Sequence, residues 1–236
     1  YLPIERIPSN LINAFLSSED KKFYNHKGID IIAIIRATIV NLISIFNNQK
    51  LIGASTITQQ VVKNLLLTNE ISIDRKIKEI LLSIRVENVL SKNQILELYL
   101  NDIYLGQRSY GVAAASLNYF NKSIDELELH EIAFLASLPK APNNYNPKKN
   151  YKKAIERRNW VIDRMYENGF IKYNDLKFKN NPIKIFERHN SIYSGGDYFY
   201  EEIRKKLYSS YGKEKLFSEG LIIKTSLDTN LQSHAE

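Results

Sequence analysis

The chain has 236 residues, of which 44% are hydrophobic and 25% charged, a composition that suits one folded domain and argues against disorder outside the C-terminal tail. Its formal net charge of +7 favours an anionic partner: nucleic acid, acidic lipid or a phosphorylated substrate. The sequence has no cysteine, which excludes disulfides and thiolate metal sites, and its four histidines are too scattered to form a zinc site.

The first segments predict a helix, a loop and then a very apolar stretch. A proline–serine pair precedes apolar residues spaced for one helix face, and residues 25–28 read as a loop. Residues 29–46 are the most apolar of the chain, but they include Asp30 and, near the middle, Arg36. A charge in the centre of a bilayer is costly, so we interpret this stretch as something other than a transmembrane helix.

Capping signals mark the later helices. A loop at 53–55 is expected to deliver Ser55 as an N-cap, and residues 75–90 carry apolar side chains at helical spacing. Two capping boxes, Ser91 with Gln94 and Ser123 with Glu126, predict further helix starts. The last helix of this series is expected to end at Pro139 and Pro142. No alternating strand pattern precedes residue 180, so the core is expected to be mainly α.

The first candidate cluster for chemistry follows the first predicted helix. Glu19 and Asp20 stand at its end, and Phe23 and His26 follow in the loop that leads to Gly28. This arrangement can present a carboxylate to a pocket. A solvated helix terminus is the alternative interpretation, because acidic side chains are mostly exposed.

The second cluster lies at the start of the helix expected from Ser55. Thr56, Gln60 and Lys63 fall on one stripe of that helix, with one cation among them. Free amides and the helix dipole favour anions at such an end, so the stripe could hold a diphosphate. The alternative is the polar outer face of an amphipathic helix.

Two further clusters come later in the chain. Arg75 and Lys76 are spaced to lie beside Glu79, either as part of a site or as a solvated charged face. The segment 92–101 is followed by a run of small residues at 112–115 that lets helices approach closely, so this cluster is mostly scaffold, and Asn101 is its one candidate for the site.

Each cluster alone is weak evidence for a function, but the order of the clusters and their separation along the chain are specific to one family. The successive motifs are Glu19-Asp20-x-x-Phe23-x-x-His26-x-Gly28, Gly53-x-Ser55-Thr56-Ile57-Thr58-Gln59-Gln60, Arg75-Lys76-x-x-Glu79, Ile95-Leu96-Glu97-x-Tyr99-Leu100-Asn101 and the run from Ala133 to Pro142. Together they strongly resemble family-51 glycosyltransferases, the peptidoglycan glycosyltransferase domains of class A penicillin-binding proteins and their monofunctional relatives.

The resemblance implies a mainly α, lysozyme-like helical domain at residues 1–175, with a small membrane-interacting jaw subdomain at about 29–54. Residues 176–236 are then a C-terminal tail, and its part from Glu219 to Asp228 is similar to the stretch that leads toward a transpeptidase domain. That second domain is absent from this sequence. Two positions depart from the family pattern, which usually has glycine where this chain has Ala54 and Arg108.

The resemblance also implies the reaction, in which lipid II is polymerised into β-1,4-linked glycan with inversion and release of polyprenyl diphosphate. Glu19 is then the general base, and Glu79 orients the cations or the substrate. The expected substrate-binding residues are Asp20, Phe23, His26, Ser55, Thr56, Gln59, Gln60, Lys63, Asn64, Arg75, Lys76 and Asn101.

No cofactor is required by the sequence; a divalent cation, Mg²⁺ or Mn²⁺, is left open, and metal ligands are unknown. The expected partners are lipid II, the growing glycan strand, membrane lipid, moenomycin-type inhibitors and other cell-wall synthesis proteins, with no nucleic acid. The expected location is the outer face of the bacterial cytoplasmic membrane, with an upstream transmembrane anchor. A lysozyme-like murein hydrolase or lytic transglycosylase, and a non-catalytic membrane-bound scaffold, are the alternatives.

Overall fold

The computed structural model describes residues 1–46, 53–68, 70, 72–186, 197–218, 223–228, 231–232 and 234. The chain divides into two compact units, Tyr1–Phe186 and Glu187–Glu236. The first unit runs past the expected boundary at 175, since Ile183 is buried against the same core. The assignment of functional domains to these segments stays a prediction.

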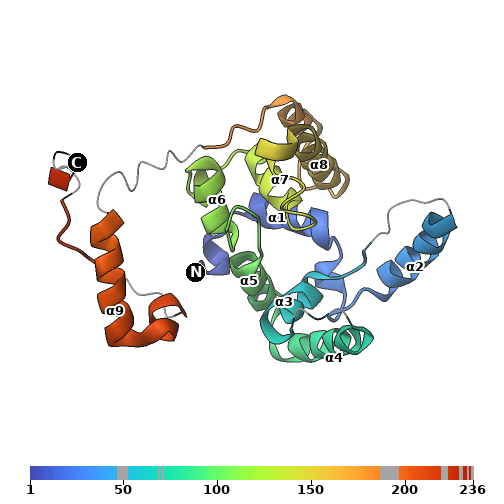
Figure 1. The fold of residues 1–236 in the computed structure, drawn as a ribbon. Coiled ribbons are helices and arrows are strands. Elements are labelled where there is room, and N and C mark those ends of the chain that lie inside the picture. The colour runs from blue at the N-terminus through green and yellow to red at the C-terminus, as the bar shows by residue number, and fades with distance from the viewer. Residues whose placement is uncertain are drawn as a thin grey trace. The chain divides into compact units, whose positions relative to one another are not determined.

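The described residues are mainly helical, as the sequence predicts, and the single β-bridge among them joins Tyr104 to Tyr110. The α-helices of the first unit are α1 (Ser9–Glu19), α2 (Ile31–Phe46), α3 (Ile57–Leu66), α4 (Ile73–Val89), α5 (Lys92–Asp102), α6 (Val112–Phe120), α7 (Leu129–Ser137) and α8 (Pro147–Glu167) (Figure 1). Its 3₁₀ helices are η1 (Ile4–Arg6), η2 (Phe23–Asn25), η3 (Ile124–Glu126) and η4 (Tyr173–Asn180). The second unit contains α9 (Asp197–Ser218).

The core of the first unit is organised around α7. Every residue of α7 from His130 to Ser137 is buried, as expected for a helix that is apolar nearly all round. α1 and α8 pack against it, while α3 packs against α4 and α5 (Figure 1). Phe15 and Phe134 are among the fully buried side chains of this core. The end of α1, which carries the first predicted motif, is therefore fixed by a packed helix.

Two of the three predicted helix starts are confirmed, and one is wrong. Ser91 with Gln94 and Ser123 with Glu126 form their capping boxes. The third N-cap is Thr56 rather than Ser55, because the Thr56 hydroxyl accepts from the Gln59 amide and also donates to the Gly28 carbonyl, 2.6 Å away. That tertiary hydrogen bond selects between two adjacent residues of similar capping propensity.

α2 stands apart from the other helices of its unit (Figure 1). Asp30 caps it by accepting a hydrogen bond from the Ala33 amide at 2.9 Å. Its surface exposes many large apolar side chains: Ile31, Ile32, Ile35, Ile39, Leu42 and Ile43. No helix in the described ranges has both the length and the hydropathy that crossing a bilayer requires. Residues 47–52 of the expected jaw lie outside the described part.

The two departures from the family pattern fall at loops. Arg108 has φ +58° and its neighbour Gln107 has φ +48°, so both occupy the left-handed region that favours glycine. Ala54 is partly buried in the loop before α3. In the tail, residues 223–228 belong to no helix or strand, and 219–222 lie outside the described residues.

Candidate active site

Glu19, the last residue of α1, lines a pocket of about 300 Å³. One of its carboxylate oxygens, Oε2, accepts a hydrogen bond from the Gln60 side chain of α3 at 3.0 Å. The rest of the wall comes from the start of α2, the loop at 53–56 and one face of α8. Three separate parts of the sequence thus meet around one carboxylate.

The surroundings of Glu19 hold its pKa above the usual range. Glu19 keeps some solvent contact, but its carboxyl group is packed deeply enough that burial raises its pKa, with a smaller contribution from the negative charge of Asp20. The hydrogen bond from Gln60 and the positive charges of Arg157 and Lys140 act in the opposite direction. The group is therefore disposed to exchange a proton closer to neutral pH than an exposed glutamate is.

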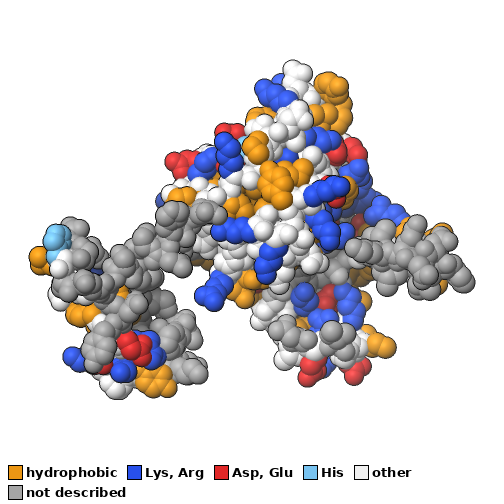
Figure 2. Space-filling view, turned by 45° about the horizontal axis from the view of Figure 1, so that its top comes forward, with side chains coloured by type: hydrophobic (Ala, Val, Ile, Leu, Met, Phe, Trp, Pro, Cys, Tyr) orange, Lys and Arg blue, Asp and Glu red, His pale blue; other side chains and the backbone are white. Residues whose placement is uncertain are grey.

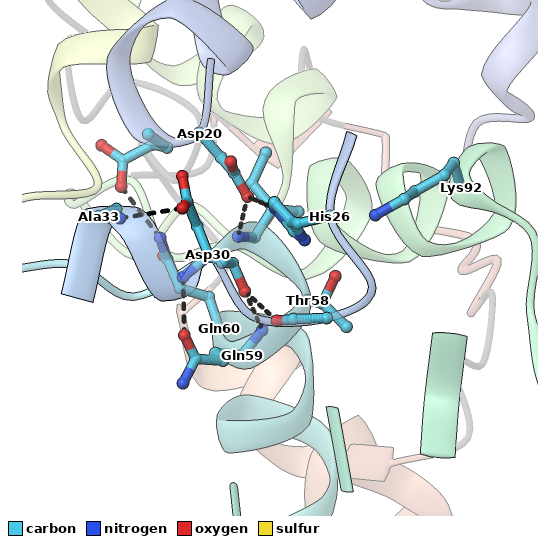
Figure 3. Close-up of polar contacts among 12 residues, drawn as sticks. Asp20, His26, Asp30, Ala33, Thr58, Gln59, Gln60 and Lys92 are labelled. Carbon is cyan, nitrogen blue, oxygen red and sulfur yellow. Dashed lines mark hydrogen bonds and ion pairs between the residues drawn. The ribbon is translucent and has the colours of Figure 1, made fainter. Parts of the chain in front are cut away.

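Asp20, next to Glu19, lines the same pocket and also holds the loop that follows α1 (Figure 3). Its Oδ2 lies 2.9 Å from His26 Nε2 and accepts a hydrogen bond of 3.1 Å from the Ile57 amide at the start of α3. Phe23 is buried in the core beneath this loop, with the Lys92 ammonium 4.4 Å from its ring centroid. Asp20, Phe23 and His26 fix the path of the chain that follows Glu19.

Thr56 and Gln59 are engaged in the cap of α3. The Gln59 side chain accepts a hydrogen bond from the Thr56 amide at 3.0 Å, and both residues are buried. Because the Thr56 hydroxyl is already bonded to Gly28, these two residues shape the loop that carries Ser55.

Ser55 connects the Glu19 pocket to a second one of about 340 Å³. Ala54 and Ser55 line both pockets, and Lys76 of α4 lines the second, where its ammonium donates to the Ser55 hydroxyl at 3.2 Å. Glu79 is buried and forms ion pairs with Lys76 and, at 3.5 Å, with Arg75. The Glu19 carboxylate and the Lys76 ammonium therefore line adjoining cavities.

The other predicted residues lie outside these two pockets. Lys63 and Asn64 are exposed farther along α3. Asn101 accepts a hydrogen bond from the Leu2 amide and donates to the carbonyls of Leu2 and Glu97, so it anchors the N-terminal segment to α5. This geometry assigns Asn101 a structural contact.

Sequence reasoning missed the contribution of α8. Trp160 and Arg164 line the Glu19 pocket, and Arg157 lies close enough to act on Glu19. Their spacing by three and four residues places them on one helix face, which is the signal that could have found them. Arg36 of α2 also lines the pocket. Figure 2 shows Lys and Arg side chains spread over the visible face of the first unit.

An apolar pocket of about 600 Å³ lies at the base of α2. Ile29, Ile31 and Ile32 line it together with Ile84 of α4, and Lys22 and Lys27 are among its polar residues. Within the described residues, no group of three histidine or acidic side chains is arranged to hold a metal ion.

The chain is similar to known proteins both in sequence and in structure. A family model described as transglycosylase matches residues 1–166. Penicillin-binding protein 1A of Rickettsia typhi is 48% identical over all of this chain, which spans 30% of that protein. Penicillin-binding protein 1A of Escherichia coli K12 is 41% identical over 99% of this chain and 27% of its own length. The crystal structure of penicillin-binding protein 1A from Haemophilus influenzae matches with a TM-score of 0.53 and 28% identity, over 91% of this chain and 22% of that one.

Proposed function

The chain belongs to the transglycosylase family, and from that premise we propose that it is a peptidoglycan glycosyltransferase that polymerises lipid II into β-1,4-linked glycan. The observation that carries the proposal is the pairing of two cavities. One holds the Glu19 carboxylate, and the other, reached through Ser55, holds the Lys76 ammonium. A transfer from a diphosphate-linked donor needs both groups, a base and a cation.

Glu19 is the proposed general base. It would take the proton from the 4-hydroxyl of the acceptor sugar as that oxygen attacks the anomeric carbon of the donor. A base works best when its pKa is near the working pH, and burial moves the pKa of Glu19 in that direction. The hydrogen bond from Gln60 leaves one carboxylate oxygen, Oε1, for the incoming hydroxyl.

The cation cluster is proposed to bind the departing diphosphate. Lys76, with Arg75 beside it and Ser55 within hydrogen-bond distance, supplies positive charge at the second cavity. Glu79 holds both cations in place, because its buried carboxylate forms an ion pair with each of them. Stabilising charge on the leaving oxygens lowers the barrier without an acid. Attack opposite an α-linked diphosphate inverts the anomeric centre and yields the β linkage.

A divalent cation at Glu79 has little support from the residues around it. Mg²⁺ and Mn²⁺ prefer several oxygen ligands, whereas the two Glu79 oxygens each face a cationic side chain. No step of the proposed reaction passes through a metal.

The exposed apolar face of α2 supports work at a membrane surface. A helix that exposes isoleucine and leucine along its length is suited to the interface of a bilayer. The apolar pocket beside Ile29 and Ile84, with Lys22 and Lys27 among its lining residues, fits an apolar chain with an anionic head. We place the enzyme at the outer face of the cytoplasmic membrane, where lipid II, the growing strand, a moenomycin-type inhibitor and other cell-wall proteins would meet it.

A murein hydrolase is the second candidate, and one observation favours it. A glycosidase needs a protonated acid for its poor leaving group, and a raised pKa at Glu19 also serves that role. The Lys76 cation beside the Ser55 hydroxyl favours transfer, because cleavage of a glycan strand releases no diphosphate.

Incubation of the protein with labelled lipid II in detergent, followed by gel separation, tests the proposal. We expect ladders of long glycan that moenomycin abolishes. Glu19→Gln should reduce the rate by roughly 10²- to 10⁴-fold, the usual contribution of a general base.

A parallel incubation with uncrosslinked glycan strands distinguishes the two candidates. Shortened strands with no product from lipid II would make the protein a hydrolase. A Glu19→Gln protein that polymerises at the normal rate would contradict the assignment of the base. A scaffold would leave both substrates unchanged.

A further inference from the structure

Trp160 is the single tryptophan of the chain, and it lines the pocket that holds Glu19. Its side chain stands on α8 and is partly exposed, with 37% of the residue open to solvent. None of the motifs that assign the reaction includes this residue.

Two arginines lie against the Trp160 ring. The Arg157 guanidinium carbon is 3.8 Å from the ring centroid, and that of Arg164 is 5.6 Å away. The shorter distance is that of a guanidinium stacked on an aromatic face, an arrangement that holds arginine without using its hydrogen bonds. The three residues share one side of α8 through their spacing.

Arg157 has few other restraints. Its Nε is buried and has no hydrogen-bond partner among the described residues. Its charge is nevertheless close enough to Glu19, and to Tyr145, for each to act on the guanidinium. The contact with Trp160 is therefore the main interaction that fixes where this charge stands.

The polar and titratable groups that act on Glu19 come from α3, α5, α8 and the loops that follow α1 and α7. Asp20 comes directly after the end of α1, Tyr99 of α5 is close enough to interact with the carboxylate, and Gln60 of α3 donates its hydrogen bond. The cations are Lys140, in the loop after α7, and Arg157 of α8. The Arg157 guanidinium is positioned by its contact with the Trp160 ring.

We propose that Trp160 is a positioning residue for the transfer reaction: its indole ring holds the Arg157 guanidinium on the Glu19 side of the pocket, so that a fixed positive charge stands beside the base. The inference rests on the proposed function of Glu19. Its consequence is that the base stays ionised at a lower pH than its burial alone allows, because a nearby cation favours the carboxylate.

The pH dependence of polymerisation by Trp160→Leu tests this role. Without the ring the acidic limb should move to higher pH, so that activity falls roughly threefold or more near about pH 6 and stays within about twofold of the parent near about pH 8. Trp160→Phe keeps an aromatic face and should restore the parent profile. Tyr166→Leu, which removes another exposed aromatic ring from α8, is the matched control and should not move the limb.

A uniform loss at every pH in Trp160→Leu would assign the ring a purely structural role and overturn the proposal. So would an unshifted profile with full activity.

The fluorescence of the single tryptophan gives a second readout that needs no substrate. Arg157→Gln should change the emission of Trp160, because the stacked guanidinium leaves the ring, whereas Lys153→Gln on an exposed face of α8 should not. Unchanged emission in Arg157→Gln would overturn the contact even if polymerisation proceeds. If the parent protein makes no glycan but the emission changes, the proposed function fails while the stacking stands.

Discussion

At the scale of single residues, Glu19 carries a conflict between stability and chemistry. Its carboxyl group is partly removed from water, and the hydrogen bond from Gln60 and the positive charges of Arg157 and Lys140 compensate for only part of that cost. A glutamate whose pKa is raised by burial costs folding free energy whenever it is ionised. The conflict follows from the proposed role, because a general base needs a desolvated carboxylate, which the fold then has to hold.

The first prediction follows from the sign of that pKa shift. The folded protein binds the proton of Glu19 more tightly than the unfolded chain, so this group destabilises at neutral pH, and the cost vanishes as the pH falls through the folded pKa toward the ordinary value of 4.5. Glu19→Gln should therefore raise the melting temperature at neutral pH by about 2–4 °C, and by less under acidic conditions. Calorimetry across the pH range checks this. A melting temperature lowered equally at all pH values would contradict it.

At the scale of secondary-structure elements, the loop before α2 is held against α4. Gly28 has φ +88°, and a Cβ atom there would lie 2.6 Å from the Ser83 carbonyl oxygen. The Gly28 carbonyl in turn accepts the hydrogen bond from Thr56. Through these two contacts a single glycine joins the end of the first motif to α3 and α4.

The second prediction separates steric contact from backbone strain. Gly28→Ala should destabilise the protein by more than the roughly 1 kcal/mol expected for a non-glycine residue in this conformation, since the new methyl group meets fixed backbone. Gly169→Ala, at φ +75° with no atom within 4 Å of the added Cβ, is the matched control and should cost only the conformational part. Urea unfolding of both variants measures the difference. Equal costs would show that the close approach to Ser83 is relieved without strain.

The same elements show what the sequence could and could not predict. The capping boxes at Ser91 and Ser123 follow local rules and were predicted correctly. The choice of Thr56 over Ser55 depends on a carbonyl 28 residues away in sequence, which no local pattern contains. The spacing of Arg157, Trp160 and Arg164 predicts that they share one face of a helix, but only the packing of α8 decides that this face lies beside Glu19.

At the scale of the whole molecule, the first compact unit ends at Phe186, beyond the last helix packed on α7. The segment after η4 closes the core, because Ile183 is buried and the Phe186 amide donates to the Tyr119 carbonyl at 2.7 Å. Arg158, fully buried in α8, donates to the carbonyls of Lys179, within η4, and of Asn181, directly after it.

The third prediction concerns truncation. A chain ending at Phe186 should keep a cooperative thermal transition, whereas one ending at 175 should unfold at a clearly lower temperature. The shorter chain loses the Lys179 and Asn181 carbonyls and leaves the buried Arg158 guanidinium with the Asn159 side chain as its remaining acceptor among the described residues, a loss of about 3–5 kcal/mol for a buried charge. Arg158→Met in the longer chain is the control, since it removes the buried charge together with its hydrogen bonds to the two carbonyls. Equal melting temperatures for the two truncations would contradict the prediction.

The fourth prediction tests the exposed face of α2 against a membrane. Ile32→Glu combined with Ile35→Glu should reduce flotation with anionic liposomes by tenfold or more, because acidic side chains replace apolar area that would enter the interface. Ile73→Glu combined with Val89→Glu, which changes two exposed apolar residues of α4, is the control and should float as the parent does. Undiminished flotation of the α2 variant would show that another surface binds lipid.

Arg157 and Arg158 are neighbours in sequence, yet one faces Glu19 and the other is bound to the backbone at Lys179 and Asn181. Adjacent residues on an α-helix point about 100° apart. The bonds of Arg158 therefore resist rotation of α8 about its own axis, and they set the direction in which the neighbouring Arg157 side chain leaves the helix.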